Sequence, residues 1–166
     1  MTKMRGVNGP TPTQTASEVW LSLIHGAKGV GYFIHVFSPS FREDGVFNDP
    51  TMVAALTSLN AEIKALVPEL NSASITELVG VSSSNPSAPI DSMVKSNGNS
   101  IYIFSAISRP GTATGTFTIN GMSGNGIVDV VNEHRTLPVM AGTFGDSFAA
   151  NGAHVYKVDM SAVTCN

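Results

Sequence analysis

The pattern of apolar and polar positions along the chain changes near residues 72–75. Before this point, apolar residues recur at helical spacing in two stretches that flank one continuous apolar run. After it, short stretches alternate apolar and polar residues, with Gly, Pro, Ser and Asn between them. The pattern therefore divides the chain into a helix–strand–helix segment, residues 1–72, and a β-sandwich domain, residues 73–166.

In the first segment, residues 11–14 (Thr-Pro-Thr-Gln) carry the signature of a helix start, with a capping box and a proline in the first turn. Residues 30–37 are apolar on both faces, which predicts a strand covered on both sides in a parallel sheet. A loop is expected at residues 38–47. A second helix should begin at Asp49 and end at Pro68.

The second segment contains eight candidate strands, at residues 75–81, 90–95, 100–106, 115–119, 126–131, 136–140, 142–148 and 153–158. This number and spacing of short strands favours an antiparallel sandwich. Residues 100–106 are mostly apolar on both faces, so they should form a central strand. The predicted fold class is mainly β, with an α/β arm in front of the sandwich.

Composition narrows the class of protein. The chain is 42% hydrophobic and 13% charged, which is enough for a real core and argues against disorder. Its net charge of −3 and scattered Lys and Arg argue against a nucleic-acid partner. No apolar stretch approaches the roughly 20 residues that cross a bilayer. No secretion signal is recognised at the start, so localisation is left open. No metal or cofactor is expected, because neither metal-ligand spacing nor a glycine-rich phosphate loop occurs.

Several stretches carry a family resemblance. The sequence SEVWLSLIHGAKGVGYF, residues 17–33, resembles the last helix–strand step of clan-A glycoside hydrolases, which have a (β/α)8 barrel. Residues 59–70 are similar to their final barrel helix. The cues at residues 101–104 (IYIF), 133–135 (EHR), 144–148 (FGDSF) and 153–157 (AHVYK) resemble the small β-sandwich that follows such barrels. Proteins of this family are often secreted or periplasmic.

The resemblance implies a fragment without the family's catalytic residues. Glycoside hydrolysis uses two carboxylates about 5–10 Å apart. In this clan they lie at the ends of the fourth and seventh barrel strands, and the chain begins after both positions. We therefore expect a truncated C-terminal fragment whose sandwich is structural or weakly carbohydrate-binding.

The candidate functional residues lie at the end of the predicted strand and in the loop after it, where α/β barrels place functional groups. The candidates for catalysis are Glu43, Asp44 and His35. The candidates for carbohydrate binding are three rings that could stack on pyranoses and one cation: Phe37, Phe41, Phe47 and Arg42. The alternative is a solvated loop whose aromatic rings pack against neighbouring parts of a barrel.

The unpaired edge of residues 30–37 predicts a homo-oligomer, because an open parallel edge invites pairing with another chain. Two other readings stay open. One is a small active hydrolase, a glycosidase or less plausibly an esterase, with its site assembled at a chain–chain junction from Arg42, Glu43, Asp44 and His35. The other is a pure carbohydrate-binding module. Residues 145–147 (Gly-Asp-Ser) match a short esterase motif, but their place before the last strand indicates coincidence.

Overall fold

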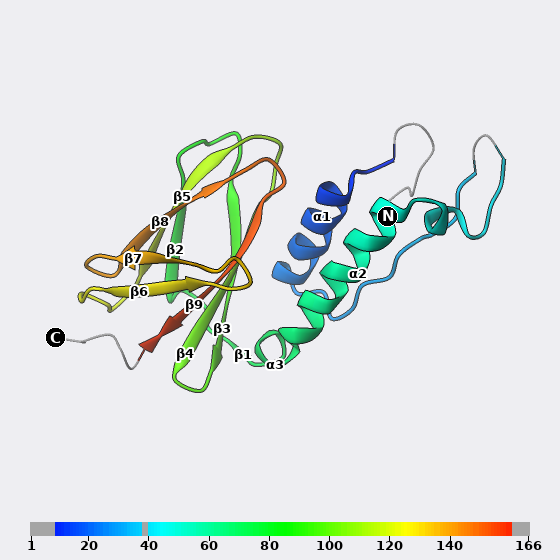
Figure 1. The fold of residues 1–166 in the computed structure, drawn as a ribbon. Helices are drawn as coiled ribbons and strands as arrows, with labels where there is room; N and C mark the ends of the chain where they lie inside the picture. Colours follow the sequence, from blue (N-terminus) through cyan, green and yellow to red (C-terminus); the bar gives the residue numbers. More distant parts are fainter. Residues whose placement is uncertain (1–8, 38–39, 161–166) are drawn as a thin grey trace.

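The computed structural model describes residues 9–37 and 40–160. Helical elements come first along the chain, and strands follow (Figure 1). The helical elements are α1 (Pro12–Ile24), the 3-10 helix η1 (Gly45–Asn48), α2 (Pro50–Ala65) and α3 (Val67–Leu70). The strands are β1 (Ala73–Ser74), β2 (Val79–Ser83), β3 (Ile90–Asn97), β4 (Ser100–Ile107), β5 (Ala113–Ile119), β6 (Gly126–Val130), β7 (Arg135–Val139), β8 (Thr143–Phe148) and β9 (Ala153–Asp159).

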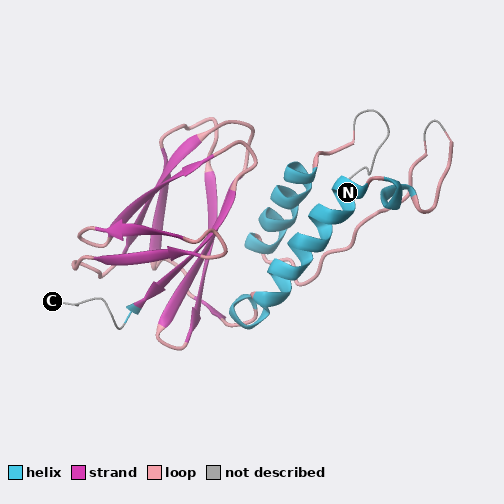
Figure 2. Cartoon of the chain, in the orientation of Figure 1, coloured by secondary structure: helices cyan, strands magenta, loops and turns pink. Residues whose placement is uncertain are grey.

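The strands form two antiparallel sheets. One sheet has six strands in the order β1-β3-β4-β9-β6-β7, and the other has three in the order β2-β5-β8. Figure 2 shows the helices gathered as an arm on one side of this sandwich. The predicted fold class, mainly β with an antiparallel sandwich after N-terminal helices, is confirmed. No helix in the described ranges is long and apolar enough to cross a bilayer.

One predicted strand is corrected. Residues 75–81 do not form a single strand, because the chain bends at Glu77, which has φ 64°. Residues 73–74 before the bend pair with β3 in the six-stranded sheet, and residues 79–83 after it pair with β5 in the three-stranded sheet. The left-handed conformation at Glu77 therefore marks the place where the chain changes sheets.

Helix α1 begins as its sequence indicates. The Oγ1 of Thr11 accepts from the backbone N–H of Gln14 at 3.2 Å, and the side chain of Gln14 accepts from the N–H of Thr11 at 2.8 Å. Its buried face packs against the outer face of β4, where the rings of Trp20 and Phe104 lie 6.1 Å apart. The first helix thus covers the larger sheet.

The main core lies between the two sheets. Phe117 of β5 stacks on Phe144 of β8 at 4.8 Å, and Tyr156 of β9 meets both rings from the opposite sheet. Strand β4 contributes to this core through Ile103 and to the helical layer through Phe104, and both are fully buried. The prediction of a central strand at residues 100–106 is therefore confirmed, since β4 lies between β3 and β9.

The prediction of a strand at residues 30–37 is wrong, and this changes the surroundings of the candidate site. The segment runs as a long loop beside α2 (Figure 1), and its one β-contact is an isolated bridge between Val36 and Arg42. It is also not buried on both faces, because Phe33 is 40% exposed and Phe37 is 66% exposed. A parallel strand needs a hydrogen-bonded neighbour, and the described chain places none beside this segment.

The second helix follows its predicted limits closely. Asp49 caps α2, since its Oδ1 accepts from the N–H of Met52 at 3.1 Å. The helix ends at Ala65, and Pro68 lies in the first turn of the separate short helix α3. Buried Leu59 joins the layer between the arm and the sandwich, while Met52 packs with the loop beside it.

Candidate functional site

The loop at residues 30–37 keeps the alternation of a strand although it has no strand partner. Tyr32, Ile34 and Val36 are half-buried on one side. Tyr32 and Ile34 pack against buried Val46 of η1. Gly31, Phe33 and Phe37 are exposed on the other side, and His35 between the two phenylalanines is half-buried. The segment therefore has one face covered by its own helical arm and one bare face.

The bare face carries a group of rings that we call the aromatic cluster: Phe33, His35, Phe37 and Phe41. Phe33 stacks on Phe37 with ring centroids 5.9 Å apart and planes 8° from parallel. His35 lies between them in sequence and contacts Phe33 at 4.9 Å and Phe41 at 5.7 Å, and Phe37 contacts Phe41 at 5.3 Å. The structure thus brings together two of the predicted sugar-binding rings, Phe37 and Phe41, with the predicted catalytic candidate His35.

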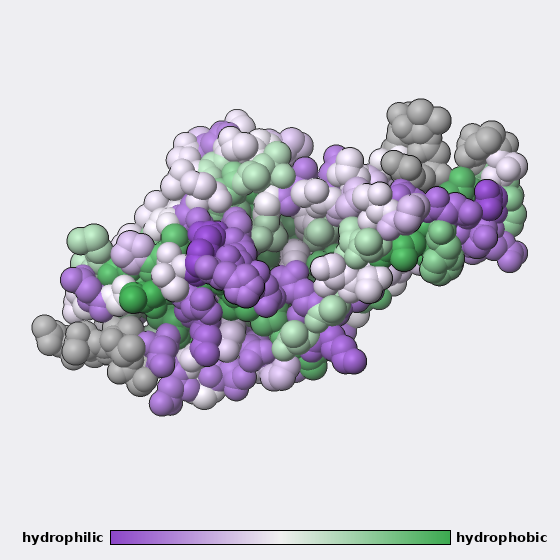
Figure 3. All heavy atoms as spheres, viewed as in Figure 1, coloured by the Kyte–Doolittle hydropathy of each residue, from purple (hydrophilic) through white to green (hydrophobic). Residues whose placement is uncertain are grey.

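The other predicted loop residues lie around this cluster without joining it. Arg42 donates to the side chain of Asn48 at 3.1 Å and lies 3.6 Å from the carboxylate of Asp44. Phe47 is 65% exposed on η1 and makes none of the cluster's ring contacts. Figure 3 shows apolar and polar surface side by side at this far end of the arm.

The catalytic candidates do not form a constellation in this chain. Glu43 and Asp44 are exposed, so their charges are hydrated and screened. Among the described residues, His35 contacts aromatic rings and makes no hydrogen bond to either carboxylate. The loop therefore lacks the buried, mutually bonded acid and base that a hydrolytic site needs.

A polar network that the sequence reading did not anticipate lies between the two sheets. We call it the inter-sheet clasp: Glu133, Arg135, Asp146, His154 and Tyr156. Asp146 comes from the three-stranded sheet and is 8% exposed. Arg135 of β7 donates to both of its oxygens, at 3.0 and 2.7 Å, and the hydroxyl of Tyr156 donates to it at 2.9 Å. These bonds join one sheet to the other.

The outer end of the clasp is formed at the β6–β7 turn. Glu133 accepts from the Nε of Arg135 at 2.7 Å, and its other oxygen lies 2.5 Å from Nδ1 of His154. The segments that supply the clasp are those that resemble the glycoside hydrolase sandwich, at residues 133–135, 144–148 and 153–157. The sequence of these segments indicated a family resemblance, but only the fold shows that their side chains contact one another.

Two groups of the clasp, Asp146 and Tyr156, have shifted pKa values. Burial opposes ionisation of Asp146, but the hydrogen bonds from Arg135 and Tyr156 outweigh it and hold the pKa of that carboxyl below its ordinary value. Burial, together with the charge of Asp146, raises the pKa of Tyr156. Groups held so firmly in one protonation state are suited to structure rather than to proton transfer.

Ser147 lies on the opposite, exposed side of β8, so the Gly-Asp-Ser motif forms no esterase site.

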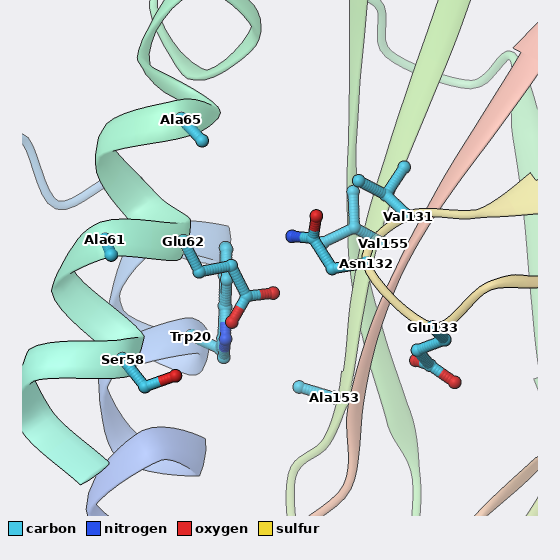
Figure 4. Close-up of a pocket in the computed structure, with 10 residues that line it drawn as sticks. All are labelled: Trp20, Ser58, Ala61, Glu62, Ala65, Val131, Asn132, Glu133, Ala153 and Val155. Atoms are coloured by element: carbon cyan, nitrogen blue, oxygen red, sulfur yellow. The ribbon is translucent and has the colours of Figure 1, made fainter. Parts of the chain in front are cut away.

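A groove of about 580 Å³ lies between α2 and the sandwich (Figure 4). Its walls are formed by Trp20, Ser58, Ala61, Glu62, Ala65, Val131, Asn132, Glu133, Ala153 and Val155. Figure 4 shows the side chain of Glu62 directed toward Asn132, whereas Glu133 is directed away from the groove. Burial raises the pKa of Glu62, the hydrogen bond with Asn132 lowers it, and the charge of Glu133 raises it. The groove does not present the two facing carboxylates of a glycosidase.

Neither metal-ligand geometry nor the comparisons with known proteins give this chain an identity. Across the described ranges, no group of three or more His, Cys, Asp and Glu side chains is arranged to hold a metal ion. Comparisons with protein-family models, with curated proteins and with solved structures found no match. The resemblance to glycoside hydrolases therefore stays a prediction from the sequence.

Proposed function

We propose that this chain is a non-catalytic β-sandwich module of a glycoside hydrolase, and that its helical arm docks as one unit of an α/β layer. The observation that carries the proposal is the two-sided character of residues 30–37. In an α/β barrel, each strand has helices on its outer face and apolar side chains on its inner face. Here the even positions face the chain's own helices, and Phe33 and Phe37 on the other side are exposed, with His35 half-buried between them.

The backbone of the same segment supports docking of a neighbouring strand. Among the described backbone hydrogen bonds, those within residues 30–37 are the pair between Val36 and Arg42 and one bond from Val46 to the carbonyl of Ile34. Other N–H and C=O groups along this segment remain available to a partner strand, which gives affinity through main-chain bonds. An aromatic surface at the same place would bury apolar area on the partner.

A second copy of the chain is the simplest probe of this surface. Light scattering after size exclusion should show an oligomer of the wild-type chain, and the double substitution Phe33→Ser and Phe37→Ser should shift it to a monomer. The matched control is Ile127→Ser on β6, since Ile127 is 67% exposed but lies on the sandwich. A wild-type monomer, or an oligomer that survives the double substitution, would count against docking through the aromatic cluster.

Weak carbohydrate binding is a second candidate function, favoured by one contact. Phe37 and Phe41 are both exposed, their centroids lie 5.3 Å apart, and Arg42 follows directly in the sequence. Electrophoresis in gels that contain soluble polysaccharides should then show retardation of the wild-type chain, and Phe37→Ala should reduce it. Equal mobility of wild type and variant in every gel would remove this candidate.

A further inference from the structure

A second pocket lies where the arm joins the sandwich, between the end of α1, the helices α2 and α3, and strand β3. Its volume is about 240 Å³. The polar groups on its walls are those of Lys28, Lys95, Asn60 and Asn71, and the remaining wall is apolar, with Leu70 and Met93 among its side chains. None of the residues that line it carries a carboxylate. The pocket thus combines two cations with an apolar surface.

Lys95 is a buried cation without an anion. It lies on β3 and is 4% exposed. Its Nζ donates to the carbonyl of Ser72 at 3.2 Å and to the hydroxyl of Ser74 at 2.9 Å, both of which are neutral. Among the described residues it has no ion pair. Burying an unpaired ammonium group is costly, so the fold keeps a charge here that a bound anion would stabilise.

Lys28 adds a second positive charge at the rim of the same pocket. Burial, and then the charge of Lys28, lower the pKa of Lys95. On α3, the Oε1 of Glu69 accepts from Asn97 at 3.1 Å, and Glu69 is not among the residues that line the pocket. Within the described chain, therefore, no carboxylate lies in the pocket to balance the two lysines.

Two amides extend the set of donors. The hydroxyl of Tyr32 donates a hydrogen bond to the Oδ1 of Asn60 at 2.9 Å, which leaves the amide N–H₂ of Asn60 available to a ligand. Asn71 also lines the pocket. Lysine and amide donors around an apolar cavity recognise an acceptor-rich, negatively charged group attached to an apolar body.

We propose that this pocket binds a small organic monocarboxylate, with Lys95 and Lys28 as the partners of the carboxylate and the apolar wall around its body. A pocket of this size accommodates a ring or a short branched chain rather than an oligosaccharide. The proposal does not depend on the glycoside hydrolase assignment, because no residue of the aromatic cluster lines the pocket.

The test uses sodium benzoate as the probe and ¹⁵N-labelled wild-type protein, with amide shifts followed by NMR. Benzoate should shift the amides of residues that line the pocket and saturate at millimolar concentration. Benzyl alcohol, which has the ring without the charge, should bind at least about tenfold more weakly, because it lacks charge-assisted hydrogen bonds. Inorganic phosphate should also bind more weakly. Equal binding of benzyl alcohol or of phosphate would overturn the assignment of an organic carboxylate.

Substitutions distinguish benzoate binding in the pocket from a nonspecific attraction of benzoate to surface lysines. Lys95→Met and Lys28→Met should each weaken benzoate binding about tenfold or more, since each removes one charged donor. Lys64→Met, on the exposed side of α2, is the matched control and should bind as the wild type does. If Lys95→Met does not fold, Lys28→Met decides, because Lys28 is exposed and its loss should not unfold the chain. Unchanged affinity in Lys28→Met, or no saturable shifts in the wild type, would overturn the proposal.

Discussion

The substitution Asp146→Asn tests whether the inter-sheet clasp stabilises the sandwich. The carboxylate of Asp146 accepts four hydrogen bonds: two from Arg135, one from the Tyr156 hydroxyl and one from the backbone N–H of Ser147. Asparagine has one oxygen and turns an N–H₂ group toward donors, so at least two of these bonds are lost. At about 1.5 kcal/mol for each bond to a charged group, the loss is about 3 kcal/mol. Water reaches the partly exposed guanidinium of Arg135 and reduces this loss, which gives an expected range of about 2–3 kcal/mol.

Urea unfolding measures this loss directly. The midpoint should fall in Asp146→Asn while the slope of the transition stays the same, because the fold and the area exposed on unfolding do not change. Tyr156→Phe is the matched variant, since it removes one hydrogen bond to the same carboxylate and keeps the ring. It should cost about 1.5 kcal/mol. A loss below about 1 kcal/mol in Asp146→Asn would refute the view that the clasp joins the sheets energetically.

The same carboxylate also sets a pH dependence. Its pKa in the folded chain is lowered by Arg135 and Tyr156 against the opposing effect of burial. A lowered folded pKa means that the stabilisation is fully present above the unfolded value of about 4 and is lost as pH falls through the folded value. The stability difference between wild type and Asp146→Asn should therefore be constant near neutral pH and shrink below about pH 4. A difference that persists unchanged into strong acid would contradict the assignment to this charge.

Three further outcomes are expected. Thr11→Ala removes the side-chain acceptor of the α1 capping box and should cost about 1 kcal/mol in the same urea assay, whereas no measurable cost would mean that α1 is not part of the cooperative unit. Gly142→Ala should cost about 2 kcal/mol or more, because φ there is 72° and a Cβ would clash with the carbonyl of Met122, and a neutral result would contradict this backbone geometry. Chromogenic glycosides should not be turned over by the wild-type chain, and turnover that Glu43→Ala or Asp44→Ala abolishes would favour the small active hydrolase instead.

The local pattern of the sequence determined most secondary structure. Helix starts follow from capping residues, and strands follow from alternation between turn residues, because both depend on neighbours along the chain. The capping box at Thr11 and the central position of β4 could be predicted for this reason. The same local reading could also find the rings of Phe37 and Phe41 as candidates, since aromatic residues at a predicted strand end and in the loop after it are visible in the sequence, whereas their exposure came from the structure.

Only the tertiary structure decided which segments meet. Apolar residues at 30–37 indicate burial, but whether a strand forms depends on a neighbour that the sequence pattern does not supply. The bond between Arg135 and Asp146 and the unpaired charge of Lys95 likewise depend on residues that come together from distant parts of the chain. Sequence periodicity indicates which faces of an element are apolar, whereas the packing of sheets and helices determines which partner each polar group contacts.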